Sequence, residues 1–310
     1  MKFSNNNIIM LRAFLMFVFC VSYSFEFRAQ QNWSNTQYAF NLYDVNLAYA
    51  GNHGVSSFGL RNRSQWMGFD GAPQTQQLSW HAPVFKQKIG IGANFQMDKI
   101  GLRVQQSARV SAAYKIALSK GYLSAGFGVG VVRQVFDKEA TLAQDNQDTQ
   151  LLALSNPILI PVIDAAVFFN TTNFYIGTEF GRIDRSSYNY SSQTEARNYY
   201  HIRLVAGYKY KLGDNDLVEV SSLTKYAEGS KVQFEGTFQY TKANFLSLGV
   251  GYRVGTAAYI LASCNITPQF RFGLSYDFNA GVDVVKNSGG LEAFLGYNLM
   301  KNSSKSIRYF

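Results

Sequence analysis

Three histidines, His53, His81 and His201, are the side chains best suited to acid–base chemistry near neutral pH. Nucleophilic hydrolysis needs a Ser or Cys within reach of a histidine that a third group orients. The Gly-x-Ser-x-Gly elbow common among hydrolases is absent from the sequence. His81 lies on the polar face of an alternating segment, where we expect a structural residue. We therefore expect no catalytic site and no enzymatic activity.

The other candidate groups for chemistry favour structural roles. Paired carboxylates occur at Asp145 and Asp148 and at Asp214 and Asp216, all in or beside predicted connections. A calcium loop needs more acidic ligands at alternating positions, so we interpret these residues as solvated charge. The glycines of Gly121–Gly130 precede no helix that would complete a phosphate site. We expect no metal and no cofactor.

The composition points to strands in a membrane. Of 310 residues, 15% are aromatic and 16% are charged, whereas a water-soluble domain has about 25% charged residues. Many Tyr, Phe and Gly with few charges are typical of lipid-facing strands that end in aromatic girdles. The net charge is +9, but the basic residues are scattered singly, so we do not expect nucleic acid as a partner.

The N-terminus has the pattern of a secretory signal. Lys2 and Arg12 precede an apolar stretch, Ala13–Phe25, that is too short to span a membrane with confidence. Cleavage after Ser24 or after Ala29 fits the small-residue requirement, and we assign residues 1–29 to the signal peptide. One cysteine then remains, Cys264, which excludes an intrachain disulfide and a Cys-rich zinc site.

Alternation with a period of two dominates the rest of the chain. In 244–253, Leu246, Leu248, Val250 and Tyr252 share one face. Segments of this kind lie near 55–66, 73–83, 88–98, 104–117, 121–135, 162–170, 173–182, 199–211, 216–225, 230–240, 244–253, 257–264, 269–277 and 290–300. Most have close to the roughly 9–11 residues with which a tilted strand crosses a bilayer. The pattern predicts an all-β fold: a transmembrane antiparallel β-barrel of about 14 strands, of the outer-membrane type.

The connections alternate in length. The turns predicted on one side are short: Val84–Gln87, Leu118–Lys120, Thr171–Thr172, Leu212–Asn215, Thr241–Ala243 and Asn265–Pro268. The other side carries the long connections Phe136–Pro161, Ile183–Asn198 and Phe278–Gly289, as in outer-membrane barrels. We expect a barrel over 55–300, a periplasmic or lumen-plugging segment over 30–54 and a periplasmic tail over 301–310.

A signature of consecutive motifs lies at the start of the barrel. It runs from Asn46-Leu47-Ala48-Tyr49-Ala50-Gly51 through Arg63-Ser64-Gln65-Trp66-Met67-Gly68-Phe69-Asp70-Gly71-Ala72-Pro73-Gln74-Thr75-Gln76 to His81-Ala82-Pro83 and Asp98-Lys99-Ile100-Gly101. In these residues the chain resembles the PorP/SprF family of Bacteroidetes outer-membrane proteins. It departs from the family at Leu47, where a proline is usual.

The resemblance implies a component of type IX secretion and gliding motility in the cell outer membrane. Members assist the export or the surface anchoring of large adhesins that carry a type IX C-terminal signal domain. The implied partners are such an adhesin, other type IX secretion components and outer-membrane lipid. The alternative is a passive porin or small-molecule transporter, which requires an open lumen. Residues 136–161, with the apolar runs Leu151–Leu154 and Ile158–Ile160 among polar neighbours, are the candidate contact loop. The alternative is that these apolar residues fold over the barrel mouth.

The signature residues have either a structural role or a role in partner contact. Gly68, Gly71 and Pro73 suit a tight hairpin, and Trp66 and Phe69 suit an outer aromatic girdle. The site residues that we predict on this basis are Asn46, Ala48, Tyr49, Ala50, Gly51, Arg63, Gln65, Trp66, Gly68, Phe69, Gly71, Pro73, Thr75, Asp98 and Gly101.

Overall fold

The computed structural model describes residues 35–136, 157–184, 187–191, 194–197, 199–213, 215–279 and 288–299. All of them belong to one compact unit, Gln31–Phe310. The predicted signal peptide, the predicted tail 301–310 and Leu151–Leu154 of the candidate contact loop lie outside the described residues. None of the described helices is long and apolar enough to cross a membrane.

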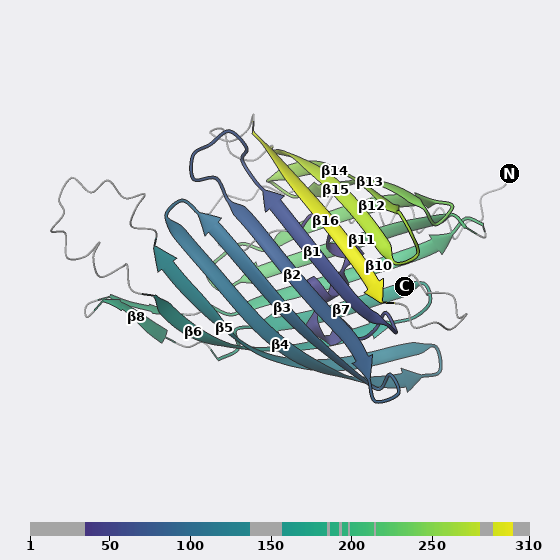
Figure 1. The fold of residues 1–310 in the computed structure, drawn as a ribbon, viewed down its shortest axis with the longest axis horizontal. Helices are drawn as coiled ribbons and strands as arrows, with labels where there is room; N and C mark the ends of the chain where they lie inside the picture. The colour runs from purple at the N-terminus through teal and green to yellow at the C-terminus, as the bar shows by residue number, and fades with distance from the viewer. Residues whose placement is uncertain are drawn as a thin grey trace. The chain divides into compact units, whose positions relative to one another are not determined.

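Fourteen of the described strands form a closed antiparallel barrel (Figure 1). They are β1 (Ser56–Ser64), β2 (Gln74–Val84), β3 (Ile89–Ile100), β4 (Arg103–Leu118), β5 (Gly121–Phe136), β6 (Ile158–Asn170), β7 (Phe174–Gly181), β10 (His201–Lys211), β11 (Leu217–Ala227), β12 (Gln233–Lys242), β13 (Leu246–Arg253), β14 (Ala257–Asn265), β15 (Phe270–Asn279) and β16 (Gly289–Leu299). The seam pairs β1 with β16, from Ser56 opposite Leu299 to Ser64 opposite Leu291. A closed barrel has no strand edge with unpaired backbone N–H and C=O groups. Lipid requires this closure because it cannot form hydrogen bonds with such groups.

The period of two sorts the side chains into two environments. On β13, Leu248 and Val250 face outward and are 54% and 56% exposed, whereas Ser247 faces inward and is buried. On β1, Leu60 faces outward while Arg61 faces inward at 1% exposure. The outward face is apolar and the inward face is rich in charge, as expected for strands between lipid and a polar lumen.

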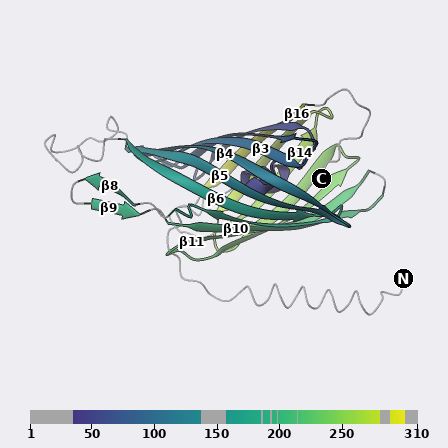
Figure 2. The ribbon, with the colours of Figure 1, turned by 90° about the horizontal axis from the view of Figure 1, so that it is seen from below.

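The two ends of the barrel differ in their connections. At the short-turn end lie the turns 85–88, 119–120, 171–173, 212–216, 243–245 and 266–269. At the long-loop end lie the connections 65–73, 137–157, 182–200 and 280–288, together with three shorter ones. Figure 2 shows the β8–β9 pair beyond the end of the barrel at which β5 ends and β6 begins.

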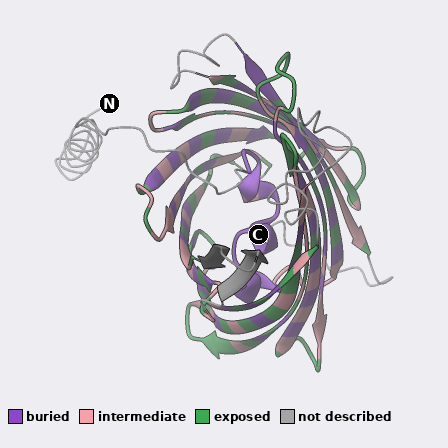
Figure 3. Ribbon diagram, turned by 90° about the vertical axis from the view of Figure 1, so that its left-hand side faces the viewer, coloured by how far each residue is buried: buried purple, intermediate pink, exposed green. Residues whose placement is uncertain are grey.

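Residues 35–55, which we call the plug, lie inside the ring of strands (Figure 3). The plug forms three short 3-10 turns, η1 (Tyr38–Phe40), η2 (Leu42–Asp44) and η3 (Leu47–Tyr49). These turns pack against the inner wall in one apolar cluster of buried residues, which includes plug residues Tyr38, Leu42, Tyr43, Leu47 and Ala48 and wall residues Ala113, Ala166, Phe168, Tyr175, Val205 and Leu223. The hydrophobic core of the protein is therefore in the lumen, between the plug and the wall.

The structure adds a feature to one predicted long connection and corrects the prediction for another. The connection predicted at Ile183–Asn198 contains a separate two-stranded sheet, β8 (Ser187–Ser191) with β9 (Thr194–Arg197), which the sequence did not predict. These strands are too short to cross a bilayer, so they gave no spanning signal. In addition, β6 begins at Ile158, so Ile158–Ile160 belong to a strand and not to a contact loop.

Candidate functional site

The first residues of the plug are held by charged side chains of the wall. The backbone N–H groups of Thr36 and Gln37 donate to the two carboxylate oxygens of Glu292, at 2.9 Å and 3.0 Å. Arg63 donates to the Thr36 hydroxyl at 2.7 Å and also pairs with Asp277. These wall residues lie near the long-loop ends of β16, β1 and β15. The plug therefore begins at the long-loop end of the lumen.

The middle of the plug contributes its own charge. Asp44 forms an ion pair with Arg61 of β1, with 2.9 Å between oxygen and nitrogen. Burial raises the pKa of the Asp44 carboxyl, and the charge of Arg61 opposes that shift. Three residues on, the Leu47 N–H donates to Glu179 at 2.7 Å, and Glu179 also binds Arg203. The lumen thus pairs its charges partly with the plug.

The plug ends at the opposite side of the lumen. The Gly51 N–H donates to His81 Nδ1 at 3.2 Å, and Lys115 Nζ donates to the Gly51 carbonyl at 3.4 Å. A Cβ atom added to Gly90 would lie 2.0 Å from the Ala50 oxygen, so only glycine fits there. Gly90 is close to the start of β3, at the short-turn end. Residues 36–51 therefore extend from one end of the strands to the other.

Two of the three histidines meet in the lumen. The rings of His53 and His81 are 5.2 Å apart, and His53 Nδ1 is 2.9 Å from the Ser57 hydroxyl. Burial, assisted by Arg271, lowers the pKa of His53 to about 3. His81 lies on the inner face, as the alternation predicts, and binds the plug backbone. His201 begins β10.

The predicted site residues lie in two places and do not form one cluster: those of the plug lie towards the short-turn end of the lumen, and the others lie at the long-loop end. Asn46, Ala48, Tyr49, Ala50 and Gly51 belong to the plug; Arg63, Thr75 and Asp98 are buried on the inner wall; Gln65, Trp66, Gly68, Phe69, Gly71 and Pro73 lie in the β1–β2 connection; and Gly101 lies in the β3–β4 turn. The side chain of Asn46 accepts from the Ala48 N–H at 3.0 Å and donates to the Val167 carbonyl at 3.2 Å. Thr75 donates to Asp98 on the neighbouring strand.

The β1–β2 connection, Gln65–Pro73, is fixed to its neighbours through the backbone. The Gly101 N–H donates to the Gly71 carbonyl at 2.8 Å, and the Met67 N–H donates to the Gly289 carbonyl at 3.0 Å. Gly68 and Gly71 have φ values of 96° and 71°, a region that favours glycine. Trp66 and Phe69 remain 39% and 43% exposed. The signature therefore combines a rigid surface loop with the wall and plug beneath it.

Sequence reasoning missed the acids that hold the plug. Glu292, Asp277 and Glu179 each occur singly in an alternating strand, where an acid is indistinguishable from any lumen-lining residue. Only their convergence on the plug shows their role. The glycines opposite the plug carried a signal, because a strand glycine often marks the close approach of another backbone.

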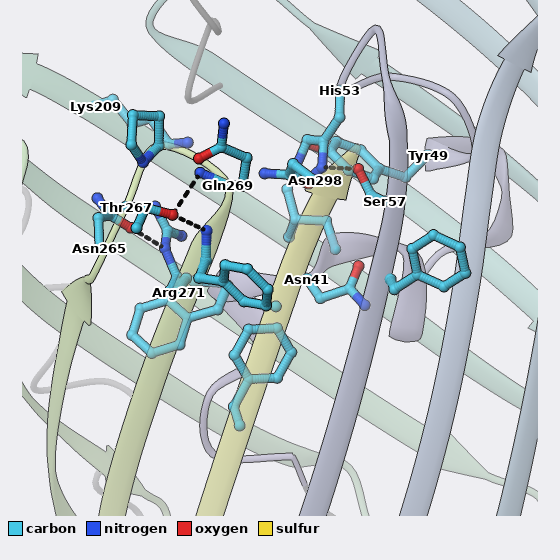
Figure 4. Close-up of a pocket in the computed structure, with 18 residues that line it drawn as sticks. Asn41, Tyr49, His53, Ser57, Lys209, Asn265, Thr267, Gln269, Arg271 and Asn298 are labelled. Carbon is cyan, nitrogen blue, oxygen red and sulfur yellow. Dashed lines mark hydrogen bonds between the residues drawn. The ribbon is translucent and has the colours of Figure 1, made fainter. Parts of the chain in front are cut away.

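A cavity of about 60 Å³ lies beside the plug near the short-turn ends of β14–β16 (Figure 4). Its lining includes the cations Lys209 and Arg271 and the amides Asn265, Gln269 and Asn298. Such a volume has room for a few water molecules and not for a solute channel. Within the described part of the chain, no group of three or more His, Cys, Asp or Glu side chains is placed to hold a metal ion.

A family model described as the type IX secretion system membrane protein PorP/SprF matches residues 27–297. The chain belongs to the PorP/SprF family. This PorP/SprF protein is an outer-membrane β-barrel and a membrane component of type IX secretion. In such barrels the long loops face the cell exterior and the short turns face the periplasm.

A search of curated proteins found no match to this PorP/SprF protein. Among solved structures, the outer membrane protein Omp33 of Acinetobacter baumannii has 8% identity and a TM-score of 0.48 over 79% of this chain and 99% of its own. The toluene transporter TodX of P. putida has 10% identity and a TM-score of 0.45 over 83% and 92%. Outer membrane phospholipase A from Escherichia coli has 9% identity and a TM-score of 0.37 over 79% and 95%. Similarities at this level carry no inference about function.

Proposed function

We propose that this PorP/SprF protein is a non-enzymatic docking platform of type IX secretion. In this role it assists the export or the surface anchoring of large adhesins with a type IX C-terminal signal domain, including those used in gliding motility. Its partners are the adhesin at the cell surface and other secretion components.

The occupied lumen is the observation that carries this proposal. A passive porin needs a continuous water path, whereas here the plug is bound to Glu292 near one end and to His81 near the other. Its 3-10 turns are buried against the wall. Transport of a small solute would require the plug to leave, so the protein is better suited to holding a partner than to conducting solutes.

The exposed β1–β2 connection supports a docking role. It presents Trp66, Met67 and Phe69 at 39%, 40% and 43% exposure, and its backbone is fixed to the β3–β4 turn and to β16. A rigid loop with exposed aromatic groups loses little conformational entropy when a partner binds. Aromatic anchors of this kind are common in binding hot spots.

The first test of this function is conductance of the purified barrel in planar bilayers. We expect no steady channels from the wild-type protein, because the plug blocks the lumen. Large, stable conductance steps would contradict docking and favour a porin.

The second test is surface display of an adhesin in cells that carry loop variants. Replacing Trp66 and Phe69 together by alanine should reduce display while the barrel still folds. The matched control is Phe245→Ala, which removes an exposed aromatic side chain from a turn at the opposite end. A second variant lacks residues 137–156. The proposal would be overturned if both this deletion and the double replacement of Trp66 and Phe69 left display of the adhesin unchanged.

A further inference from the structure

The cavity at the short-turn end has the chemistry of a site for carboxylates. Lys209 and Arg271 enter it from β10 and β15, with Asn265, Gln269 and Asn298 around them (Figure 4). The guanidinium group of Arg271 donates to the Asn265 side chain at 2.8 Å and lies 5.6 Å from the Phe40 ring centroid. These contacts fix its orientation. An oriented guanidinium is well suited to bidentate binding of a carboxylate.

Among the described side chains at this mouth, positive charge exceeds negative charge. A third inward-facing cation, Lys115 of β4, contacts the end of the plug. Among the described residues, the inward-facing acid at this end is Glu219, whose carboxylate lies 3.9 Å from Lys209 Nζ and accepts from the Tyr175 hydroxyl at 2.9 Å. Burial is the main cause of the lowered pKa of His53, and the charges of Arg271, Lys209 and Lys115 lower it further. This is consistent with a positive potential around the imidazole ring of His53.

Exposed lysines surround the same mouth. They lie in the short turns and at the adjoining strand ends: Lys86, Lys88, Lys120, Lys211 and Lys242. The acids in these turns are Asp214, which is outside the described residues, and Asp216, whose carboxylate is engaged by Tyr240 and by the Ala243 N–H. The long-loop connection 137–157 has the opposite balance in its sequence, with four acids and one lysine.

We propose that the short-turn end of the barrel docks an acidic segment of a periplasmic protein, with one of its carboxylates entering the cavity between Lys209 and Arg271. The exposed lysines steer the acidic segment to the mouth, as complementary charge does in protein association. Cations that face the lumen favour a protein over lipid, because lipid headgroups contact the outside of the barrel wall. This site is at the opposite end from the surface loops, so it stands without the adhesin role.

The test uses the full-length protein in phosphatidylcholine nanodiscs and a fluorescent ten-residue polyglutamate peptide as the probe. The variant carries Lys209→Gln with Arg271→Gln, and the matched control carries Lys99→Gln with Lys231→Gln at the long-loop end. Fluorescence anisotropy should show roughly tenfold weaker binding for the variant, about 1.4 kcal/mol. The control should bind as the wild type does. Exchanging the two cations, with Lys209→Arg and Arg271→Lys, keeps the charge and should retain most of the affinity.

Heat-dependent gel mobility reports whether each variant is folded. If the variant with Lys209→Gln and Arg271→Gln does not fold, a triple variant of exposed lysines, with Lys86→Gln, Lys88→Gln and Lys120→Gln, replaces it. We expect this triple variant to bind the peptide several-fold more weakly than the wild type does. Equal losses in the variant and the control, or wild-type binding in every variant, overturn the proposal. It is also overturned if the variants lose association with phosphatidylglycerol vesicles while their affinity for the peptide is unchanged, which would assign the cations to lipid.

Discussion

Close approach between the plug and the wall depends on individual glycines. A methyl group at Gly90 would collide with the Ala50 carbonyl, because the added Cβ would be 2.0 Å from that oxygen. We expect Gly90→Ala to destabilise the barrel by about 1–3 kcal/mol, the usual cost of overpacking. Urea unfolding in detergent measures it. The control is Gly236→Ala on β12, where the nearest atom to an added Cβ is 3.8 Å away; equal stability of the two variants would contradict this account.

Asp216, in a turn at the short-turn end, gives a prediction for pH. The Ala243 N–H, followed by the Tyr240 hydroxyl, lowers the pKa of this carboxyl below its usual 3.8. A lowered folded-state pKa adds stability above about pH 3.8, and that stability is lost as the pH falls through the folded-state value. Asp216→Asn should therefore be less stable than the wild type at pH 7, with the difference vanishing in acid. Urea midpoints at several pH values measure this; a difference that is constant with pH would refute it.

A second variant separates the two donors to Asp216. Tyr240→Phe removes the hydroxyl and leaves the Ala243 N–H in place. Its loss of stability at pH 7 should be smaller than that of Asp216→Asn and should disappear over the same range of pH. A loss as large as that of Asp216→Asn would mean that the backbone donor contributes nothing.

The role of a residue was predictable from the sequence where that role produces a pattern among neighbouring residues. Alternation alone placed His81 on the inner face, and Gly68 and Gly71 were expected in a turn, where they have positive φ values. Glu292 was not predictable as a plug ligand, because its partners Thr36 and Gln37 lie more than 250 positions away in the chain. The basic mouth was missed for the same reason: its cations are single residues in separate turns and strands.

At the scale of the element, the plug is a short segment of 3-10 turns that wall charges hold in place. Glu292 receives two plug N–H groups and also pairs with Arg61 and Arg63. Glu292→Gln removes the charge between two buried arginines, and breaking a buried pair in this way costs about 3–5 kcal/mol. We expect the plug to be released more often. The initial rate of chymotrypsin cleavage between Tyr38 and Tyr49 should rise.

Glu219→Gln is the matched control for that experiment. Glu219 is also an inward-facing acid, but its contacts are with Tyr175 and Lys209 of the wall. Its replacement should leave plug cleavage at the wild-type rate. Equal acceleration in both variants would mean that general loosening of the barrel, and not loss of plug binding, exposes the segment.

The strands were predictable as elements because lipid on one side and a polar lumen on the other impose alternation on every crossing. All fourteen barrel strands match a predicted segment, and the largest shift at a strand start is at β6, which begins at Ile158 instead of residue 162. The strand β6 is longer than a bilayer crossing requires. In its first residues, Ile158–Ile160, all three side chains are apolar, so the sequence there does not alternate between apolar and polar residues. The β8–β9 pair lacked any such constraint.

At the scale of the whole molecule, the plug precedes β1 in the chain and yet lies within the closed ring. We expect a chain that lacks residues 35–50 to reach the folded form more slowly and less completely from urea into detergent, because the apolar cluster of the lumen would lack its centre. Heat-dependent gel mobility over time measures this. The matched control keeps residues 35–50 but permutes their order, which preserves the composition and removes the specific contacts. If both variants folded as fast as the wild type, the expectation would be contradicted.

The seam between the first and last strands has a consequence for the lifetime of the folded state. Residues 35–55 are joined directly to β1, and the pairing of β1 with β16 closes the ring around them. The ring can therefore close only when residues 35–55 are already inside it. The reverse path is restricted in the same way: residues 35–55 must either slide lengthwise out of a filled tube or wait for the seam to part. Both routes break many contacts at once, so this architecture makes the barrel slow to come apart, whatever its equilibrium stability.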